Sequence, residues 1–328
     1  MIEEYKKLTV IVPVYNEEKN IYKLLNNLNQ QSIKGFEVIV VDDGSTDKTV
    51  EILETYISDS FHLRLIKQRN MGAAKARENA IKAAKGDYVA LVDCDDLLAS
   101  DSIEKAMIFL IKNNLNISLF NLHYVNNNSD PASQQVFQYY TDKQIISGYE
   151  AFVNCISYWG IHAFGIYEKN IFIEAYDEYN SLNQESVNYL NNDEVISRIC
   201  FSVSERVGMS NGHYYFISNP ESTTRRVNKN YYRVIHNAFY LLQYIQTRDE
   251  RINNDFVVYE TYKLIVSTVW GVFVRFKKWK KGLDASERNM WQDLIKKSVK
   301  NILFLKKKNH FRLSVKSRLQ LLLIRYFT

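Results

Sequence analysis

Three carboxylates stand together near residue 95. The stretch YVALVDCDDLL, residues 88–98, begins with residues suited to a buried strand and runs directly into Asp93, Cys94, Asp95 and Asp96. Carboxylates this close repel one another unless they bind a cation. The hard oxygens of Asp93 and Asp95 suit Mg²⁺ or Mn²⁺, which keep positions open for phosphate oxygens. The stretch therefore predicts a divalent metal bound by Asp93 and Asp95.

Polar clusters also follow the three earlier apolar runs of the chain. They cover residues 13–17, 42–47 and 70–77. Each cluster alone could close a turn or cap a helix, as Asp95 or Asp96 could for the helix that follows them. In an open parallel sheet, however, ligands bind at the carboxyl ends of the strands. Four clusters at that edge therefore predict one binding site.

The elements that position these clusters alternate between strands and helices. Unalternating apolar runs, typical of strands buried on both faces, cover residues 8–15, 36–43, 62–67 and 88–93. Helical patterns follow them at 17–31, 47–56, 72–85 and 101–112. This alternation predicts an α/β fold with a mostly parallel sheet and helices on both faces. We also expect a strand at 116–125, mixed elements over 147–217 and only helices beyond residue 229.

The usual backbone cradles for phosphate are missing from the chain. Neither G-x-G-x-x-G nor G-x-x-x-x-G-K-[ST] follows the first strand, and an acidic rim would repel a bare phosphate. A divalent cation removes this conflict because it binds carboxylate and phosphate oxygens together. Other carboxylates of the rim can accept hydrogen bonds from a ribose or a base N–H. The pattern therefore predicts a nucleotide diphosphate that a metal joins to the protein.

The four clusters also carry a family resemblance. VIVPVYNEE, VIVVDDGSTD, NMGAAKARENA and GDYVALVDCDD, in this order and spacing, resemble the family 2 glycosyltransferases. The resemblance implies the GT-A fold, a Rossmann-like sheet, and an inverting transfer from a nucleotide-sugar, for which we expect a UDP-sugar. It makes Asp93 and Asp95 the DxD motif that holds the metal. It also implies a nucleotide pocket lined by Pro13, Tyr15, Glu17, Asp42, Asn70, Arg77 and Asp93.

The resemblance further implies a general base near the start of a later helix. The best match is Asn192-Asp193-Glu194-Val195-Ile196, in which Asn192 stands where relatives usually have Glu. Asp193 is then the base, which takes the proton of the acceptor hydroxyl, and Glu194 is the alternative. Asp193 could also be the N-cap of a helix at 194–202, and one residue can do both.

Two more segments resemble parts of the family. HYYFISNPESTTRR, residues 213–226, resembles the segment that closes over the diphosphate, with Ser222, Thr224, Arg225 and Arg226 as donors, although an Arg pair can also be a solvated surface feature. WGIHAFGIYEKNIF, residues 159–172, occupies the stretch that contacts the acceptor in relatives. Because Ala163 and Gly165 replace the expected Trp and Lys, no acceptor is implied. His162 either lines that pocket or packs in the core.

Charge divides the chain into two parts. From Thr261 to the end there are 17 Lys and Arg against 3 Asp and Glu, whereas the first 260 residues carry 25 against 34. We expect a catalytic domain at 1–225, with a nucleotide-binding half at 1–115 and an acceptor-side half at 116–225. A basic helical region at 226–328 follows. Three cysteines without paired spacing and an acidic N-terminus without a signal-peptide pattern favour a cytoplasmic location.

The basic region interleaves Lys and Arg with large apolar residues, as in VRFKKWKKG and FLKKKNHFRLSVKSRLQLLLIRYF. Helices of this kind lie on anionic membrane surfaces, although a solvated helical subdomain has the same composition. Nucleic acid is a competing partner, but no nucleic-acid-binding module accompanies these helices. The longest apolar run, Leu264–Val274, has 11 residues, and a membrane span needs roughly 20. We therefore expect peripheral binding to the inner face of the cell membrane and no nucleic-acid partner.

Together these features predict a metal-dependent glycosyltransferase. We expect a hexosyltransferase or N-acetylhexosaminyltransferase whose acceptor is a glycan or lipid-linked glycan, a precursor of a cell-surface polysaccharide. One alternative is a sugar-1-phosphate nucleotidyltransferase, which should have a Gly-rich phosphate loop near the N-terminus that this chain lacks. The other is a non-catalytic nucleotide-binding or glycan-binding module.

Overall fold

The computed structural model describes residues 7–125, 135–139, 141–184, 186, 190–218 and 227–327. The chain forms two compact units that alternate along the sequence. The first unit consists of Met1–Asn154, Gly160–Asp177 and Ile196–Asn219, and the second of Cys155–Trp159, Glu178–Val195 and Pro220–Thr328. The second unit thus takes in two short segments that precede residue 225, so no single cut in the sequence separates the two.

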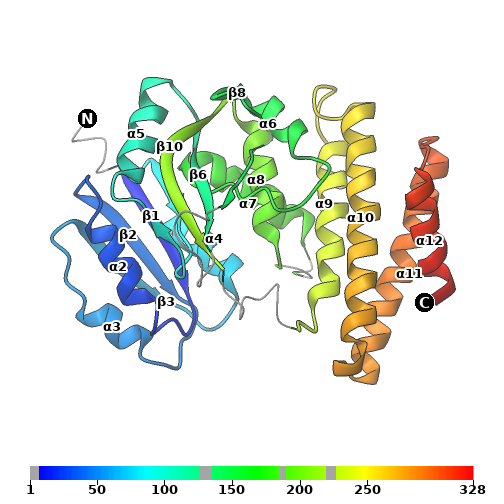
Figure 1. The fold of residues 1–328 in the computed structure, drawn as a ribbon, viewed down its shortest axis with the longest axis horizontal. Coiled ribbons are helices and arrows are strands. Elements are labelled where there is room, and N and C mark those ends of the chain that lie inside the picture. The colour runs from blue at the N-terminus through cyan, green and yellow to red at the C-terminus, as the bar shows by residue number, and fades with distance from the viewer. Residues whose placement is uncertain are drawn as a thin grey trace. The chain divides into compact units, whose positions relative to one another are not determined.

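The first unit is built on one mixed sheet (Figure 1). Its strands are β1 (Leu8–Val14), β2 (Phe36–Asp42), β3 (Phe61–Lys67), β4 (Tyr88–Leu91), β5 (Leu97–Leu98), β6 (Ile117–Val125), β7 (Gln135–Val136), β8 (Ile145–Ser147), β9 (Gly165–Glu168) and β10 (Arg206–Ile217). Their order is β3-β2-β1-β4-β9-β6-β10-β5, with β7 beside β6 and β8 beside β10. The strands β1 to β4 pair in parallel, as do β6 and β10, whereas β9 runs antiparallel to its neighbours. The predicted α/β fold is confirmed.

Helices cover both faces of this sheet. They are α2 (Ile21–Asn29), α3 (Thr49–Thr55), α4 (Ala73–Ala83), α5 (Ser102–Lys112), α6 (Gly148–Asn154), α7 (Lys169–Leu182) and α8 (Asn192–Val203). Val10 and Val12 of β1 belong to the core cluster that contains the buried face of α2. Ile11 points to the opposite face and is equally buried, on the side where α4 contacts β1 and β2. Burial on both faces explains why the strands read as unbroken apolar runs.

The helix predicted at 17–31 begins later than expected, at Ile21. The residues before it form a turn in which the Glu17 carbonyl accepts from the Asn20 and Ile21 amides. The Glu17 amide donates to the hydroxyl of Thr49, the first residue of α3, and the Glu18 amide donates to Asp47 in the loop after β2. This tie between two loops explains the late start, and it keeps Glu17 at the sheet edge.

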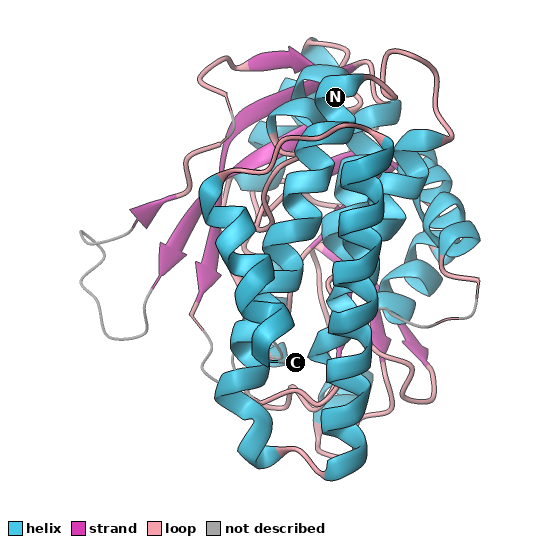
Figure 2. Cartoon of the chain, turned by 90° about the vertical axis from the view of Figure 1, so that its right-hand side faces the viewer, coloured by secondary structure: helices cyan, strands magenta, loops and turns pink. Residues whose placement is uncertain are grey.

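The second unit is helical, as predicted for the region beyond residue 229. Its long helices are α9 (Val234–Gln246), α10 (Asp255–Trp279), α11 (Ala285–Lys308) and α12 (Val315–Phe327), and they run side by side (Figures 1 and 2). The side chain of Asn254 caps α10, and Asp284 and Glu287 form a capping box at the start of α11. Trp291 is fully buried in the core that α10 forms with its neighbours.

One described helix is long and apolar enough to cross a membrane. It covers Asp255–Gly282, and 56% of its most apolar window is buried inside the structure. Core helices of soluble proteins have the same length and composition. Because α10 packs against α9, α11 and α12, its role at the centre of the helical unit accounts for its apolar residues.

Candidate functional site

The parallel register of the first unit brings the predicted acids to one edge of the sheet. Val14 pairs with Asp42 across β1 and β2, and Ile11 pairs with Leu91 across β1 and β4. The chain therefore leaves β1 with Tyr15 next to the Val14–Asp42 pair, and Asp93 follows the end of β4 by two residues at the same edge. Tyr15 is 48% exposed, so its ring is available to a ligand.

Two loops at this edge hold each other in place. Asn16, whose φ of 57° lies in the left-handed region that Asn tolerates, accepts from the Thr46 amide at 2.8 Å through its side chain. Its own amide donates to the Ser45 hydroxyl at 2.8 Å. The Glu17 amide donates to the Thr49 hydroxyl, also at 2.8 Å. These bonds set the position of Tyr15 and Glu17 relative to Asp42.

The neighbours Asp42 and Asp43 have different environments. The carboxylate of Asp43 accepts from the Met71 and Gly72 amides at 2.7 Å each and from the Gln68 side chain at 2.8 Å. It therefore holds the turn before α4, which includes Asn70. Asp42 accepts only from the Ser45 amide, at 3.2 and 3.3 Å, among the described residues. Asp42, the residue predicted for the nucleotide, is thus the one that keeps acceptor capacity.

Arg77 and Asp93 form an ion pair. Nη2 of Arg77 lies 2.9 Å from Oδ1 of Asp93, and both side chains are largely buried. The pair joins the first turns of α4 to the end of β4, so these two predicted site residues do meet. The arginine compensates one carboxylate of the DxD sequence, whereas Asp95 next to it is partly exposed.

Asp96 is a structural residue of the loop, but it is not a helix cap. It is 1% exposed and accepts from the Tyr214 hydroxyl and the Ile217 amide, both at 2.8 Å. Burial and the charge of Asp93 raise the pKa of Asp96 to about 8. The N-cap position of α5 is held by Asp101 instead. Asp96 thus ties the acidic loop to β10, a role that sequence reasoning missed because the partners lie more than a hundred residues away.

The pKa of Glu17 reflects both its burial and the neighbouring acids of this edge. Burial raises the pKa of Glu17, the hydrogen bond from Asn20 lowers it, and the charges of Asp95, Asp47 and Asp93 raise it further. The net shift is upward, with burial as its largest cause and the three acids as smaller ones. A bound cation would relieve that repulsion.

The carboxylates at this edge fit a divalent metal of the Mg²⁺ type. Within the described ranges no group of three or more His, Cys, Asp or Glu side chains is arranged to hold a metal ion. Mg²⁺, however, is usually bound by one or two carboxylates together with substrate phosphates, rather than by a cage made of protein alone. Asp95 and the second oxygen of Asp93 would be that number of ligands, and the metal stays a prediction.

Asp193 and Glu194 lie in the first turn of α8. Since α8 begins at Asn192, Asp193 is inside the helix, and the N-cap interpretation of this residue is wrong. Asp193 is exposed, whereas Glu194 is buried with 9% exposure. A base must meet a substrate hydroxyl, so exposure favours Asp193. Both residues belong to the second unit and the DxD acids to the first, and the role of Asp193 stays a prediction.

The remaining predicted residues divide into two groups. Ser222, Thr224, Arg225 and Arg226 lie outside the described residues. His162 packs among aromatic side chains, with ring centroids 5.3 Å from Phe137 and 5.5 Å from Tyr124 and Phe216. The packed interpretation of His162 therefore agrees with the structure.

A histidine pair was not predicted. Ring nitrogens of His123 on β6 and His213 on β10 lie 2.7 Å apart. Burial and the neighbouring His213 lower the pKa of His123. The strands are parallel neighbours, with His213 in register with Asn121, so only the tertiary pairing brings these two residues together.

Comparisons with known proteins show which family part of the chain resembles. Residues 9–168 match the model of Glycosyl transferase family 2. The poly(ribitol-phosphate) beta-N-acetylglucosaminyltransferase TarS of Staphylococcus aureus is 37% identical over 131 residues, which are 39% of this chain and 23% of TarS. The uncharacterized glycosyltransferase YibD of Escherichia coli is 36% identical over 121 residues, 37% of this chain and 35% of YibD. These matches span less than half of each relative.

The solved structures extend the similarity in fold. The crystal structure of S. aureus TarS 1-349 in complex with UDP-GlcNAc superposes with a TM-score of 0.63 at 21% identity, over 90% of this chain and 81% of that one. The structure of the same TarS segment without that ligand gives a TM-score of 0.62 at 22% identity. The GT-A architecture predicted from the sequence is confirmed by this likeness. Residues 9–168, which carry the ordered motifs, match glycosyl transferase family 2.

Proposed function

We propose that this protein is an inverting glycosyltransferase that moves a sugar from a UDP-sugar to a hydroxyl group of a glycan. The observation that carries this proposal is the sheet edge at which Asp42, the Arg77–Asp93 pair and Asp95 stand together in a family 2 domain. The relative TarS is named as an N-acetylglucosaminyltransferase, and one of its structures contains UDP-GlcNAc. UDP-GlcNAc is therefore the first donor to test.

In this proposal different residues of the sheet edge bind different parts of the nucleotide-sugar donor. The exposed ring of Tyr15 packs against the base, and Asp42 accepts a hydrogen bond from the base or the ribose. Asn70 is held nearby because Asp43 fixes its turn. Arg77 holds Asp93 in one orientation. These side chains bind and orient the nucleotide, and Glu17 adds to the negative potential that favours a cation.

The proposal includes Mn²⁺ or Mg²⁺ held by Asp95 with Asp93. When bound, such a metal neutralises the charge that develops on the departing diphosphate. Asp193 then takes the proton of the acceptor hydroxyl on the opposite face of the sugar, and a single displacement inverts the anomeric carbon.

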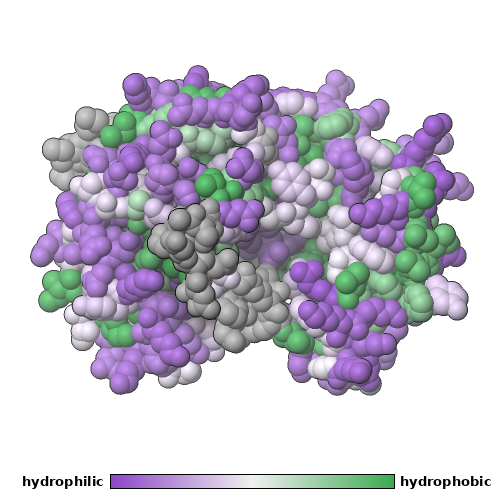
Figure 3. Space-filling view, in the orientation of Figure 1, coloured by the Kyte–Doolittle hydropathy of each residue, from purple (hydrophilic) through white to green (hydrophobic). Residues whose placement is uncertain are grey.

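We also propose that α12 rests on an anionic membrane surface. Val315, Leu319, Leu322 and Tyr326 follow each other at intervals of four, three and four residues, which places them on one face of the helix. They are between 57% and 83% exposed, and Figure 3 shows apolar side chains on the surface over this part of the chain.

Charge favours a lipid surface as the partner of this face. No Asp or Glu follows Asp293, whereas Lys316, Arg318 and Arg325 accompany the apolar stripe on α12. Each Lys or Arg close to an anionic bilayer contributes about 1 kcal/mol. A second copy of α12 would instead bring like charges together. A lipid-linked glycan acceptor at the cytoplasmic face of the cell membrane suits an enzyme held in this way.

The test of the proposed function is nucleotide binding followed by transfer. A ligand at 100 times its dissociation constant adds about 2.7 kcal/mol to the free energy of unfolding, which a thermal unfolding experiment detects readily. We expect UDP to stabilise the protein in the presence of Mn²⁺ and other nucleoside diphosphates to do so less. UDP-GlcNAc hydrolysis in the presence of the metal then distinguishes an enzyme from a binding module. No stabilisation by any nucleotide, with or without Mn²⁺, would refute the proposal.

A further inference from the structure

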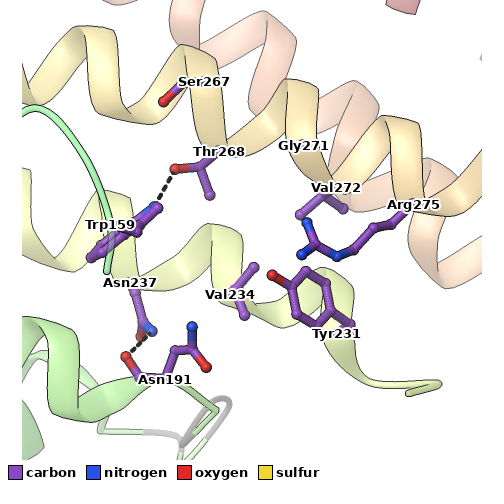
Figure 4. A pocket seen from close by; sticks show the side chains of 10 residues that line it. All are labelled: Trp159, Asn191, Tyr231, Val234, Asn237, Ser267, Thr268, Gly271, Val272 and Arg275. Atoms are coloured by element: carbon purple, nitrogen blue, oxygen red, sulfur yellow. Dashed lines mark hydrogen bonds between the residues drawn. The ribbon is translucent and has the colours of Figure 1, made fainter. Parts of the chain in front are cut away.

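The second unit contains a cavity of about 170 Å³ between α9, α10 and two short segments of the chain (Figure 4). Its lining includes Trp159, Asn191, Tyr231 and Arg275, all of which belong to this unit. Pockets that hold drug-sized ligands measure about 300–1,000 Å³. This cavity therefore has room for a part of a ligand, such as one phosphate with a portion of a sugar, and not for a whole nucleotide.

Arg275 gives the cavity a positive charge that its surroundings do not cancel. Its guanidinium lies 4.3 Å from the centroid of the Tyr231 ring, which holds the planar group in one orientation. Among the residues that the structure describes, no carboxylate forms an ion pair with Arg275 and no hydrogen bond joins it to another residue. A half-buried arginine in this state has donors ready for an anion.

Two further donors face the same cavity. The side-chain amide of Asn191 and the hydroxyl of Tyr231 lie beside it in Figure 4, and neither forms a hydrogen bond within the described part of the chain. Burial raises the pKa of Tyr231 and the charge of Arg275 lowers it, with a net upward shift. The hydroxyl is therefore a donor at neutral pH. Three donor groups suit a phosphate, which offers more acceptor oxygens than a carboxylate.

The surrounding side chains form a fixed frame. The Trp159 indole N–H donates to the Thr268 hydroxyl at 2.8 Å. The Asn237 amide donates to the Leu190 and Asn191 carbonyls at 2.9 Å each, and Asn237 also accepts from the Tyr179 hydroxyl. This network holds the Asn191 backbone in its left-handed conformation, with φ of 55°. The cavity and the start of α8 are thus parts of one hydrogen-bonded arrangement.

We propose that this cavity binds a phosphate group of the acceptor, with Arg275 pairing to it and with Asn191 and Tyr231 donating hydrogen bonds. The inference rests on the proposed function, because Asn191 stands two residues before Asp193, the proposed base. If the phosphate of an acceptor occupies the cavity, we expect the sugar or polyol next to that phosphate to lie near the carboxylate of Asp193. The acceptor is then a phosphate-bearing glycan, either a polymer with phosphodiester links or a lipid-diphosphate-linked sugar.

The experiment measures the binding of inorganic phosphate to the full chain by calorimetry. Divalent metal is left out, so that the acids at the sheet edge of the first unit do not bind phosphate through a metal. We compare Arg275→Gln with Lys278→Gln, which removes the same charge from an exposed position of the same helix. We expect Arg275→Gln to weaken binding of inorganic phosphate at least tenfold and Lys278→Gln to leave it nearly unchanged. Equal binding by the two variants, or no binding by the unmodified protein, overturns the inference.

A second variant guards against misfolding of the first. Asp tolerates the left-handed conformation almost as well as Asn, so Asn191→Asp keeps the backbone and adds a negative charge to the cavity. It should also weaken phosphate binding, with an unchanged midpoint of thermal unfolding. Phosphate binding equal to that of the unmodified protein would contradict the proposed site.

Two ligands identify the source of the phosphate. Tighter binding of a glycerophosphodiester than of pyrophosphate supports a phosphodiester polymer, and the reverse supports a lipid-linked diphosphate. Stabilisation by UDP and Mn²⁺ is measured on the same variants and should be unaffected. If UDP binding is intact and phosphate binding fails, only this inference is wrong. If UDP fails to bind the unmodified protein, the proposed function is wrong.

Discussion

The sheet edge of the first unit gathers acids and the helical unit gathers bases, and the two sets of charges are compensated differently. At the edge, Asp43 is satisfied by backbone amides and Asp93 by Arg77, while burial and, to a smaller extent, the charges of Asp95, Asp47 and Asp93 raise the pKa of Glu17. In the helical unit, Arg275 and Lys277 lie over aromatic rings. The cluster of acids suits a cation, and the cations on ring faces suit anions.

Substitution of the proposed base should have the largest effect. We expect Asp193→Asn to lower the rate of sugar transfer by about 10²–10⁴-fold, since a general base contributes an acceleration of that size. UDP binding should persist because the acids of the first unit are untouched. Transfer rates and thermal shifts with UDP test this together. Glu194→Gln is the matched control, and a larger loss there than in Asp193→Asn would exchange the two roles.

The acidic edge is tested by Asp95→Asn. If Asp95 binds the metal, Mn²⁺ should no longer increase the stabilisation by UDP, which is about 2.7 kcal/mol at 100 times the dissociation constant for the unmodified protein. Thermal unfolding with and without Mn²⁺ measures the difference. Asp59→Asn, at an exposed position of the same unit, is the control. A metal response in Asp95→Asn equal to that of this control would show that Asp95 is not a ligand.

Substitutions in α12 test the proposed membrane binding of the basic helical unit. Replacing Leu319 and Leu322 together by Ser removes two apolar side chains from the proposed membrane face, and we expect binding to anionic vesicles to fall at least tenfold, since each buried leucine contributes roughly 1.5–3 kcal/mol. Both are exposed, so the fold should remain stable. Vesicle co-sedimentation measures the change, with Ile57→Ser on the first unit as control. Unchanged binding would remove α12 from the membrane proposal.

The smallest expected effect concerns Glu78, an acid that its own neighbours compensate. It is 2% exposed and pairs with Lys75 and Lys82 at 2.8 and 2.7 Å. Burial raises the pKa of Glu78, but the hydrogen bonds and charges of the two lysines lower it overall. Glu78 is therefore the counterpart of Glu17, whose pKa is raised.

We expect Glu78→Gln to lower the free energy of unfolding by about 1 kcal/mol at pH 7, a modest figure because the lysines are partly exposed. A carboxyl with a lowered pKa in the folded state stabilises the fold above its unfolded pKa, and this contribution is lost as the pH falls through the folded value. The difference between variant and unmodified protein should thus shrink below about pH 4. Urea unfolding at several pH values measures it, and a difference that grows with acidity would contradict the assignment.

Much of the first unit could be predicted because its signals are local. Strands buried on both faces read as apolar runs, and parallel strands joined by helices all end at one edge. The positions of Tyr15, Asp42 and Asp93 at that edge follow from these two rules. The different roles of Asp42 and Asp43 do not, because both are acids at the same strand end, and only the turn of Met71 and Gly72 distinguishes them.

The sequence by itself determined the alternating elements, the acidic strand ends and the helical nature of the basic region. Periodicity and composition encode these features over short stretches. Tertiary structure alone decided that Asp96 bonds to Tyr214 and that residues near 159, 191, 231 and 275 surround one cavity. Such contacts join segments far apart in the chain, and no spacing in the sequence marks them, because they depend on how the helices and strands pack.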